Sequence, residues 1–378
     1  MDTRSIRRVL VRAPNWLGDA VMALPALTRL RRLFAGAHVA ILARDSVAGL
    51  FEGEALADEV LIANDEGVGG FLRQARILRS GNFDLAVLLQ NSFRAALLAR
   101  VSRARTVAGY PTDGRRFLLS VVVPFATDYK KNHQVFYYLA IASQLERMLG
   151  GADAANARSA SEADFESVKP RLVASRAEIE RAIGILKDSG IGTAGTGSSR
   201  ILALNPGATN SRAKRWLAER FAQTADQLAA RDGFQTIIIG TRGDLEIADQ
   251  VASHMQSRAA VLAGRTTIGE LKGVLACSSL VISNDTGAAH VSAALGVPTV
   301  VVFGPTEHFA THPLSDVAEV VRHPVDCSPC MLRDCPIDHR CMTRVEVDDV
   351  YMTAQRLLAQ VEAKKSPVST LEPANFQR

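Results

Sequence analysis

A polar loop over residues 205–216 combines hydroxyl, amide and basic side chains in one short stretch. Thr209, Asn210 and Lys214 can each donate a hydrogen bond, and the ammonium group adds its charge to that bond. The loop follows the predicted strand 201–204, so we expect it at the carboxyl edge of a sheet, where open α/β folds bind ligands. It lacks the Gly-Lys-Ser/Thr ending of a Walker loop. These residues therefore suit phosphate binding of another kind.

A second candidate phosphate site lies in residues 283–290, between a short apolar segment and a helix rich in small residues. Asp285 or Thr286 can serve as the N-cap, and Gly287 leaves the backbone amides uncovered. Free amides at the positive end of a helix suit an anion such as a diphosphate, and His290 lies one turn further along the same face. A well-capped helix with a satisfied histidine explains the same residues. This stretch by itself leaves both interpretations open.

Two acidic residues follow predicted strands, where a carboxylate can act on a bound ligand. Asp19 comes after the strand 8–13, and it could take a proton as a general base or cap a helix predicted over 20–34. Asp244 closes a strand of the second half, and it could bind ribose hydroxyls or cap the helix that follows it. The positions alone decide neither role.

Strand and helix patterns alternate twice along the chain. They predict an α/β fold of two Rossmann-like, doubly wound domains that face a central cleft. The strongest boundary signal is a Gly- and Ser-rich stretch, which is typical of a flexible linker. The predicted division is an N-terminal domain over 1–189, a linker over 190–199, a C-terminal domain over 200–363 and a flexible polar tail over 364–378.

The composition argues against several classes of protein. With 378 residues and 47% hydrophobic content the chain can fill sizeable cores. It has no apolar run of the roughly 18–20 residues that a membrane span needs, and no secretory apolar segment at its start, so we expect a cytoplasmic protein. The net charge of +5 favours anionic partners, but no motif for reading nucleic acid accompanies it. No Gly-x-Gly-x-x-Gly follows either first strand, which argues against a nicotinamide oxidoreductase.

Four stretches together resemble the ADP-heptose–lipopolysaccharide heptosyltransferases, and most of all heptosyltransferase II. They are Asn-Trp-Leu-Gly-Asp at 15–19, Asn-Ser-Phe-Arg at 91–94, the loop 206–216, and Ser-Asn-Asp-Thr-Gly with a following histidine at 283–290. The resemblance implies a GT-B fold with the nucleotide sugar on the second domain and the acceptor on the first. It also implies an inverting glycosyltransferase that moves L-glycero-D-manno-heptose from ADP-heptose to the heptosyl-Kdo2-lipid A inner core of lipopolysaccharide, without a divalent metal.

The resemblance further implies roles by position. Asp19 matches the general base, and Lys214 would stabilise the departing diphosphate. The implied donor-binding residues are Thr209, Asn210, Lys214, Asp244, Thr266, Thr267, Ile268, Asp285, Thr286, Gly287 and His290, with the adenine pocket at 266–268. The implied acceptor-binding residues are Asn15, Asn91, Ser92, Arg94 and Arg116. No Asp-x-Asp pair stands in a suitable loop, so we expect no metal or other cofactor.

Alternatives remain within and outside this family. Heptosyltransferases I and III act on different acceptors, and the sequence does not give the shape of the first-domain loops that would choose between them. A non-catalytic ADP-binding protein on the same fold is a different class. Asp19, expected on the domain opposite the phosphates, argues against that class because binding alone needs no acid there.

Basic residues are frequent in the first half, where they form either a solvated face or a collective attraction for anions. The implied acceptor carries carboxylates and phosphates at an anionic membrane, so we expect peripheral contact with the inner leaflet, worth about 1 kcal/mol per cation near the surface. The residues are Arg94, Arg100, Arg103, Arg105, Arg115, Arg116, Lys130 and Lys131.

Four of the five cysteines lie within one short region, at Cys327, Cys330, Cys335 and Cys341. Their spacing, C-x2-C-x4-C-x5-C, begins like a zinc site but lacks the regular second pair. Free thiols and a bound structural metal both fit this spacing, whereas disulfides do not suit a cytoplasmic chain.

Overall fold

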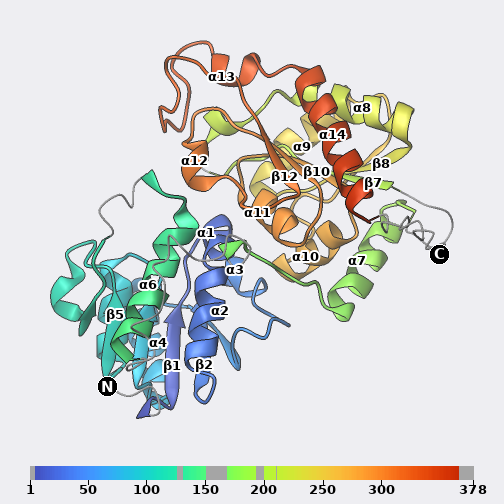
Figure 1. Ribbon diagram of the computed structural model, residues 1–378. Helices are drawn as coiled ribbons and strands as arrows, with labels where there is room; N and C mark the ends of the chain where they lie inside the picture. The colour runs from blue at the N-terminus through green and yellow to red at the C-terminus, as the bar shows by residue number, and fades with distance from the viewer. Residues whose placement is uncertain (1–4, 126–130, 150–167, 193–199, 210, 366–378) are drawn as a thin grey trace, which may run out of the picture.

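A computed structural model describes residues 5–125, 131–149, 168–192, 200–209 and 211–365. The chain folds into two α/β halves, with the blue-to-green N-terminal half below the green-to-red C-terminal half in Figure 1. Most of the predicted linker and almost all of the predicted tail lie outside the described residues. Within the described ranges no helix is both long enough and apolar enough to span a membrane.

The first half is built on six parallel strands in the order β3-β2-β1-β4-β5-β6. They are β1 (Arg8–Arg12), β2 (His38–Ala43), β3 (Glu59–Ile62), β4 (Leu85–Leu88), β5 (Thr106–Gly109) and β6 (Val121–Val122). The helices are α1 (Leu17–Met22), α2 (Leu24–Leu33), α3 (Asp45–Ala48), α4 (Gly67–Ser80), α5 (Phe93–Val101), the 3-10 helix η2 (Arg115–Leu118) and α6 (Gln134–Leu149). In this doubly wound order the chain reverses between β1 and β4, so the loops after these two strands are neighbours at the carboxyl edge.

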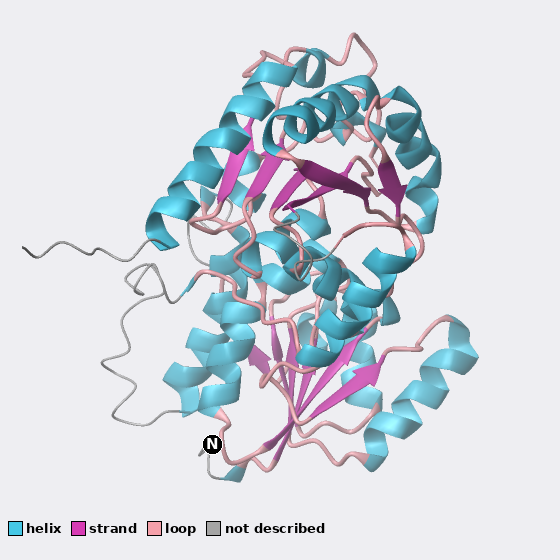
Figure 2. Ribbon diagram, turned by 90° about the vertical axis from the view of Figure 1, so that its right-hand side faces the viewer, coloured by secondary structure: helices cyan, strands magenta, loops and turns pink. Residues whose placement is uncertain are grey.

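The second half repeats the same winding in the order β9-β8-β7-β10-β11-β12, again with parallel pairs. Its strands are β7 (Arg200–Asn205), β8 (Phe234–Ile238), β9 (Ala259–Val261), β10 (Leu280–Asn284), β11 (Thr299–Val302) and β12 (Ala318–Val321). Its helices include η6 (Arg212–Lys214), α8 (Ala218–Asp232), η7 (Arg242–Asp244), α9 (Leu245–His254), α10 (Ile268–Ala276), α11 (Gly287–Ala294), α12 (His308–Thr311), α13 (Arg340–Thr343) and α14 (Val347–Lys365). Helices flank the strands of both halves in Figure 2. The predicted α/β fold with one architecture used twice is confirmed.

Alternation along β1 divides the first half into two cores. Val9 and Val11 face a core shared with α2 and α6, and Leu10 faces a core shared with α4, α5 and η2. Strands covered on both faces are apolar on both sides, which is why Val9, Leu10 and Val11 form a continuous apolar run rather than an alternating one. The helices α4 and α5 thus cover one face of the first sheet, and α2 and α6 cover the other.

The helix predicted over 20–34 is two helices, α1 and α2. The break falls at Ala23, and Pro25 occupies the first turn of α2. Proline has no backbone N–H to continue the preceding helix, but it is well suited to begin a new one. The prediction of a single helix was wrong because it gave no weight to this proline.

Helix α7 (Arg176–Asp188) packs against α10 of the second half (Figure 1). The predicted division assigns α7 to the first domain because the helix precedes the glycine-rich stretch. Lys272 of α10 is fully buried at this contact, with its Nζ 3.1 Å from Glu178 Oε1 of α7 and 3.5 Å from Glu54 Oε1 of the first half. One buried cation therefore joins α7, α10 and the first half.

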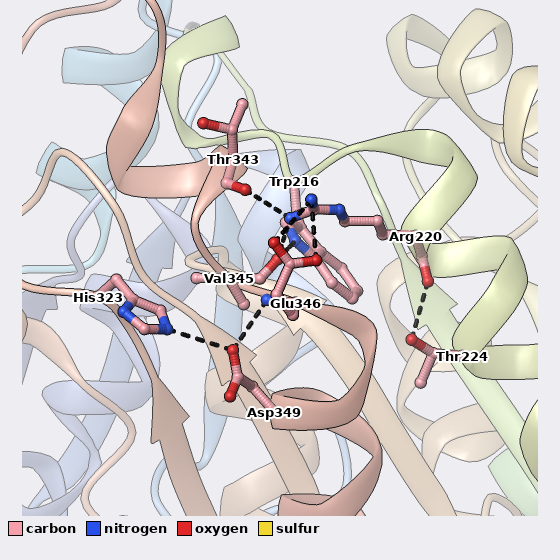
Figure 3. Close-up of polar contacts among 8 residues, drawn as sticks. All are labelled: Trp216, Arg220, Thr224, His323, Thr343, Val345, Glu346 and Asp349. Carbon is pink, nitrogen blue, oxygen red and sulfur yellow. Dashed lines mark hydrogen bonds and ion pairs between the residues drawn. The ribbon is translucent and has the colours of Figure 1, made fainter.

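Trp216 fixes the end of the loop that carries Lys214. Its indole is fully buried, and Nε1 donates to the Val345 carbonyl at 3.0 Å. Arg220 of α8 donates to the same carbonyl and to the Thr343 carbonyl, as Figure 3 shows. The end of α13 and the turn before α14 thereby hold the segment from which the loop projects.

Candidate functional site

The loops after β1 and β10, one from each half, meet at the first turns of α1 and α11. A Cβ built on Gly287 would lie 2.7 Å from Leu17 Cβ and 3.0 Å from Gly18 N. Any larger residue at position 287 would push the two halves apart. Gly287, which the sequence analysis assigned to an uncovered helix N-terminus, is thus also needed for the close approach of the two halves.

Asn284 links the two candidate phosphate loops of the second half. Its buried amide accepts a hydrogen bond from the Trp216 backbone N–H at 2.9 Å and donates to the Pro206 carbonyl at 2.8 Å. Residues 206–216 and 283–290 therefore form one structural unit, although nearly 80 positions separate them.

Lys214 and Asp285 form an ion pair within this unit, with Nζ 2.7 Å from Oδ2. The Thr306 hydroxyl donates to the same carboxylate oxygen at 2.8 Å. Asp285 is buried, and a buried carboxylate needs hydrogen-bond or ionic partners. The two donors supply them, so the negative charge of Asp285 is neutralised and does not repel a bound phosphate. An ammonium group has three donors, and this pair needs one of them. Lys214 can therefore keep its partner and still bind a phosphate oxygen.

The start of α11 presents backbone amides without a side-chain cap. Thr286 is the N-cap residue, but its side chain makes no capping bond. Its hydroxyl instead accepts a hydrogen bond from Asn205 Nδ2 at 2.6 Å and lies 3.2 Å from Ser283 Oγ. The first-turn amides, together with the positive end of the helix dipole, remain suited to an anion.

Asp19 lies inside the first turn of α1, which begins at Leu17 after the N-cap Trp16. The alternative that Asp19 caps a helix starting at Ala20 therefore does not hold. Burial raises the pKa of the Asp19 carboxyl, while hydrogen bonding to the Tyr138 hydroxyl and the charge of Lys214 lower it. A carboxylate of the first half thus lies within the electrostatic influence of the phosphate loops of the second.

His290 is buried against Gly18, where a Cβ would lie 3.1 Å from His290 Cδ2. Burial lowers the pKa of His290 to about 4, although the charge of Asp285 acts to raise it. The imidazole is therefore neutral near pH 7. It can offer a phosphate a hydrogen bond but not a positive charge.

His133 connects the halves beside this site. Its Nε2 donates to the His312 carbonyl of the second half at 2.7 Å, and its Nδ1 accepts from the Val135 backbone N–H at 3.2 Å. A carbonyl can only accept and an amide can only donate, so these partners require the neutral ring. Burial lowers the pKa of His133 to about 4, in agreement with that requirement.

The other predicted donor residues lie around the same edge of the second sheet. Asp244 is buried beneath Gly207, where a Cβ would lie 2.3 Å from its Cγ, and its Oδ2 accepts from the backbone and hydroxyl of Thr241. It therefore serves the loop structure, and a ribose contact stays a prediction. Thr209 is exposed, and Asn210 lies outside the described residues.

The predicted adenine residues lie at the start of α10. Thr267 caps that helix in a capping box with Glu270. Ile268 packs against Gly49 of the first half, where a Cβ would lie 3.3 Å from Ile268 Cβ, and Thr266 is half-buried beside it. The structure gathers these residues at the seam between the halves, and their contact with a base stays a prediction.

Two predicted acceptor residues are held by neighbours in the first half. Asn91 donates from Nδ2 to the Tyr137 hydroxyl at 2.7 Å and accepts from Arg115 at 3.2 Å. Ser92 caps α5 by accepting from the Ala95 backbone N–H. Both residues follow β4 and lie at the carboxyl edge of the first sheet.

The other three predicted acceptor residues differ in how far their side chains are already engaged by hydrogen bonds and ion pairs. Asn15 accepts from Arg12 Nη2 at 3.0 Å, close to Asp19 in the chain. Arg94 is engaged by Asp65, with Nε 3.1 Å from Oδ2, and donates to backbone carbonyls at the start of α4. Arg116 is exposed. Arg94 and Arg116 are both exposed, but the guanidinium of Arg94 is held by Asp65 and by backbone carbonyls.

The basic cluster of the first half is not one surface. Arg115 is completely buried and donates to the Tyr110 and Gln90 carbonyls, and burial lowers its pKa to about 10. The expectation that it faces solvent or acceptor is therefore wrong, because its guanidinium holds the loops after β4 and β5. Lys130 lies outside the described residues.

The cysteine region contains exposed, half-buried and buried thiols. Cys327 and Cys330 are exposed, Cys335 is intermediate and Cys341 is buried, and all are free. Burial and the neighbouring thiols raise the pKa of Cys341 to about 11. Among the residues that the structure describes, no group of three or more side chains is placed to hold a metal ion.

Sequence reasoning missed three contributors to this site. Tyr138 contacts Asp19 from the middle of α6, Thr306 contacts Asp285 from the loop after β11, and Asn205 orients Thr286 from the end of β7. Asn205 ends β7 and Thr306 lies in the loop after β11, and a polar residue at or after the carboxyl end of a strand is a usable signal. Tyr138 carries no signal, because a tyrosine within an apolar helix reads as core.

Comparison with known proteins identifies the family. The sequence profile described as glycosyltransferase family 9 (heptosyltransferase) matches residues 71–340. The chain belongs to this family. The resemblance inferred from four short motifs is therefore confirmed, as is the prediction of a glycosyltransferase. Asp19 precedes the matched range, so its role rests on the geometry described above and stays a prediction.

Individual family members resemble the chain over most of its length. Lipooligosaccharide heptosyltransferase 2 of Campylobacter jejuni (serotype O:2) is 28% identical over 359 residues, covering 93% of this chain and 98% of that protein. Lipopolysaccharide heptosyltransferase 2 of Escherichia coli K12 is 26% identical, covering 83% and 88%. The structure of E. coli ADP-heptose lps heptosyltransferase II has the same fold, with a TM-score of 0.78 at 24% identity, covering 94% and 99%.

Proposed function

We propose that this protein is a heptosyltransferase II, which moves L-glycero-D-manno-heptose from ADP-heptose to heptosyl-Kdo2-lipid A with inversion and without a divalent metal. Relatives named heptosyltransferase 2 support this choice. The observation that carries the mechanism is that Asp19 of the first half lies close enough to the Lys214–Asp285 pair of the second half for the charge of Lys214 to lower its pKa. A binding protein would need no desolvated carboxylate at that seam.

Asp19 acts as the general base in this proposal. The acceptor hydroxyl oxygen forms a bond to C1 of heptose, the C1–O bond to ADP breaks, and Asp19 takes the hydroxyl proton. A single displacement inverts the anomeric centre, so one carboxylate is sufficient. The raised pKa makes Asp19 a better proton acceptor than an exposed aspartate, since a base is most effective when its pKa approaches the working pH.

Lys214 and the first-turn amides of α11 stabilise the departing ADP. Negative charge grows on the diphosphate as the C1–O bond breaks, and fixed donors near that charge lower the barrier. Asp285 positions Lys214 at 2.7 Å rather than binding the donor through its own carboxylate. The neutral His290 supplies a hydrogen bond at the next turn of the same helix.

The acceptor of this proposal is a lipid-linked oligosaccharide, so the enzyme works at the cytoplasmic side of the inner membrane as a peripheral protein. The acceptor sugar enters from the first half, where Asn15, Asn91, Ser92 and Arg116 lie along the carboxyl edge of the sheet. ADP-heptose binds to the second half, and nucleic acid plays no part.

Purified protein should be incubated with ADP-heptose and either Kdo2-lipid A or its monoheptosylated form, and the product measured by mass spectrometry with and without EDTA. We expect transfer to the monoheptosylated acceptor alone, unaffected by EDTA. Transfer to Kdo2-lipid A would indicate heptosyltransferase I, and a requirement for a diheptosylated acceptor would indicate heptosyltransferase III. ADP binding without turnover on any acceptor would indicate a non-catalytic protein.

A further inference from the structure

The outer face of α4 exposes large apolar side chains to solvent. Val68 is 78% exposed, Leu72 is 56% exposed and Ile77 is 51% exposed. The opposite side of the same helix is already satisfied, because Ala75 and Leu78 are buried in the core beneath it. The exposed side chains are therefore not needed for packing within this half.

Three exposed arginines, Arg73, Arg76 and Arg79, share that face. The helix itself contains no Asp or Glu. Over residues 67–105 the chain has seven arginines and one acid, Asp84, which is buried. The charges that α4 itself carries are therefore all positive, while the exposed acid Glu66 lies directly before the helix and is paired with Arg44 at 3.9 Å.

The same character continues onto the neighbouring helices α5 and η2. Helix α5 contacts both α4 and η2. Val101 of α5 is exposed, and Phe117 of η2 is 73% exposed beside the exposed Arg116. We call Val68, Leu72, Ile77, Val101 and Phe117, with the arginines around them, the α4–η2 face. Apolar side chains surrounded by cations mark an interaction surface rather than an ordinary solvated one.

We propose that the α4–η2 face docks on an anionic lipid bilayer. Aliphatic and aromatic side chains insert at the level of the headgroups, while arginine stems lie along the apolar region with their guanidinium groups among lipid phosphates. A nucleic acid would satisfy the arginines but would leave Val68, Leu72 and Ile77 without a partner. An anionic lipid bilayer provides phosphates for the arginines and an apolar region for the aliphatic side chains.

The position of this face fits the path of a lipid-linked acceptor, and in this respect the inference rests on the proposed function. Arg94 donates to the Gly67 carbonyl at 2.7 Å, so the start of α4 adjoins the start of α5. The predicted acceptor residues Asn91 and Ser92 lie directly before that start. A bilayer on the α4–η2 face would therefore lie beside the acceptor edge of the first sheet.

The test is flotation of full-length protein with phosphatidylcholine vesicles, with and without phosphatidylglycerol. We expect binding to the anionic vesicles that weakens with salt. Leu72→Asp/Ile77→Asp should reduce the partition coefficient at least about tenfold, and Arg73→Glu/Arg76→Glu/Arg79→Glu should do so as well, since each cation near the surface contributes about fivefold. Met352→Asp changes a side chain of similar exposure (62%) on α14 of the other half and should leave binding unchanged.

The proposal would be overturned by wild-type protein that does not float with anionic vesicles, by α4 variants that float as well as wild type, or by an equal loss with Met352→Asp. Binding of RNA instead of vesicles, measured by fluorescence anisotropy, would assign the face to nucleic acid and would overturn it too. Heptosyl transfer to an acceptor dissolved in detergent separates the proposed function from the proposed docking face. Vesicle binding without heptosyl transfer refutes the proposed function alone, and normal transfer without vesicle binding refutes the docking face alone.

Discussion

Replacing Asp19 by asparagine separates chemistry from folding at the seam between the two halves. The amide keeps the shape of the side chain and an oxygen that can accept from Tyr138, but it cannot take a proton from the acceptor. A positioned base contributes about 10²–10⁴ in rate, which is about 3–5 kcal/mol of activation free energy. We expect turnover of ADP-heptose by Asp19→Asn to fall at least about a hundredfold.

The free energy of unfolding should change little, because two effects oppose each other. Asp19 lies in the first turn of α1, where a negative charge stabilises a helix by about 0.3–1 kcal/mol. Burial raises its pKa, however, which means that the ionised carboxylate is disfavoured in the folded protein at neutral pH. The neutral amide of Asn loses the favourable interaction with the helix dipole, but it also avoids the cost of burying a charge. The melting temperature should therefore stay within a few degrees of the wild type.

The assay is ADP release on the monoheptosylated acceptor, with ADP affinity measured by calorimetry as the folding control. Asp45→Asn, which removes an acid from the first turn of α3, is the matched variant and should keep normal turnover. The wild type should lose turnover as the pH falls through the raised pKa of Asp19, because protonation removes the base. Turnover of Asp19→Asn within a few-fold of the wild type would refute the reasoning.

Three further predictions concern charged and titrating groups. Lys214→Ala should weaken ADP binding about tenfold or more in calorimetry, because a charge-assisted hydrogen bond to phosphate is lost. Adding Asp285→Asn should restore the melting temperature but not the affinity, since it removes the unpaired buried charge. Unchanged affinity in the single variant would contradict the role of Lys214. Lys272→Met should lower the free energy of unfolding in urea by about 3–5 kcal/mol, because the buried carboxylate of Glu178 and the half-buried carboxylate of Glu54 lose their partner. Lys272→Met/Glu178→Gln should regain part of that stability, and wild-type stability in the single variant would show that the cation is dispensable. Because the pKa of His133 is about 4 and its ordinary value is 6.5, stability should be complete above about pH 6.5 and should fall as the pH approaches 4. His133→Gln should flatten that fall, and an identical pH dependence in both proteins would argue against it.

The sequence by itself determined the features that depend on short stretches of chain. Continuous apolar strands alternating with helices predicted both sheets, since a parallel strand covered on two faces is apolar on both sides. Polar loops 205–216 and 283–290 stood out because hydroxyl, amide and ammonium groups follow directly after strands. The motifs that resemble the heptosyltransferases lie in those same loops. The one clear local failure, the division of 20–34 into α1 and α2, came from passing over Pro25.

Only the tertiary structure decided which of these side chains are buried and what they contact. Arg115 and Arg116 are adjacent in the sequence, yet one is buried among backbone carbonyls and the other is exposed. Tyr138 reaches Asp19 from another helix, and Lys272 joins elements that lie far apart in the chain. Desolvation and ion pairing depend on neighbours brought together by folding, and local sequence periodicity contains no information about them. The raised pKa of Asp19 and the compensation of Asp285 by Lys214 are therefore properties of the folded protein alone.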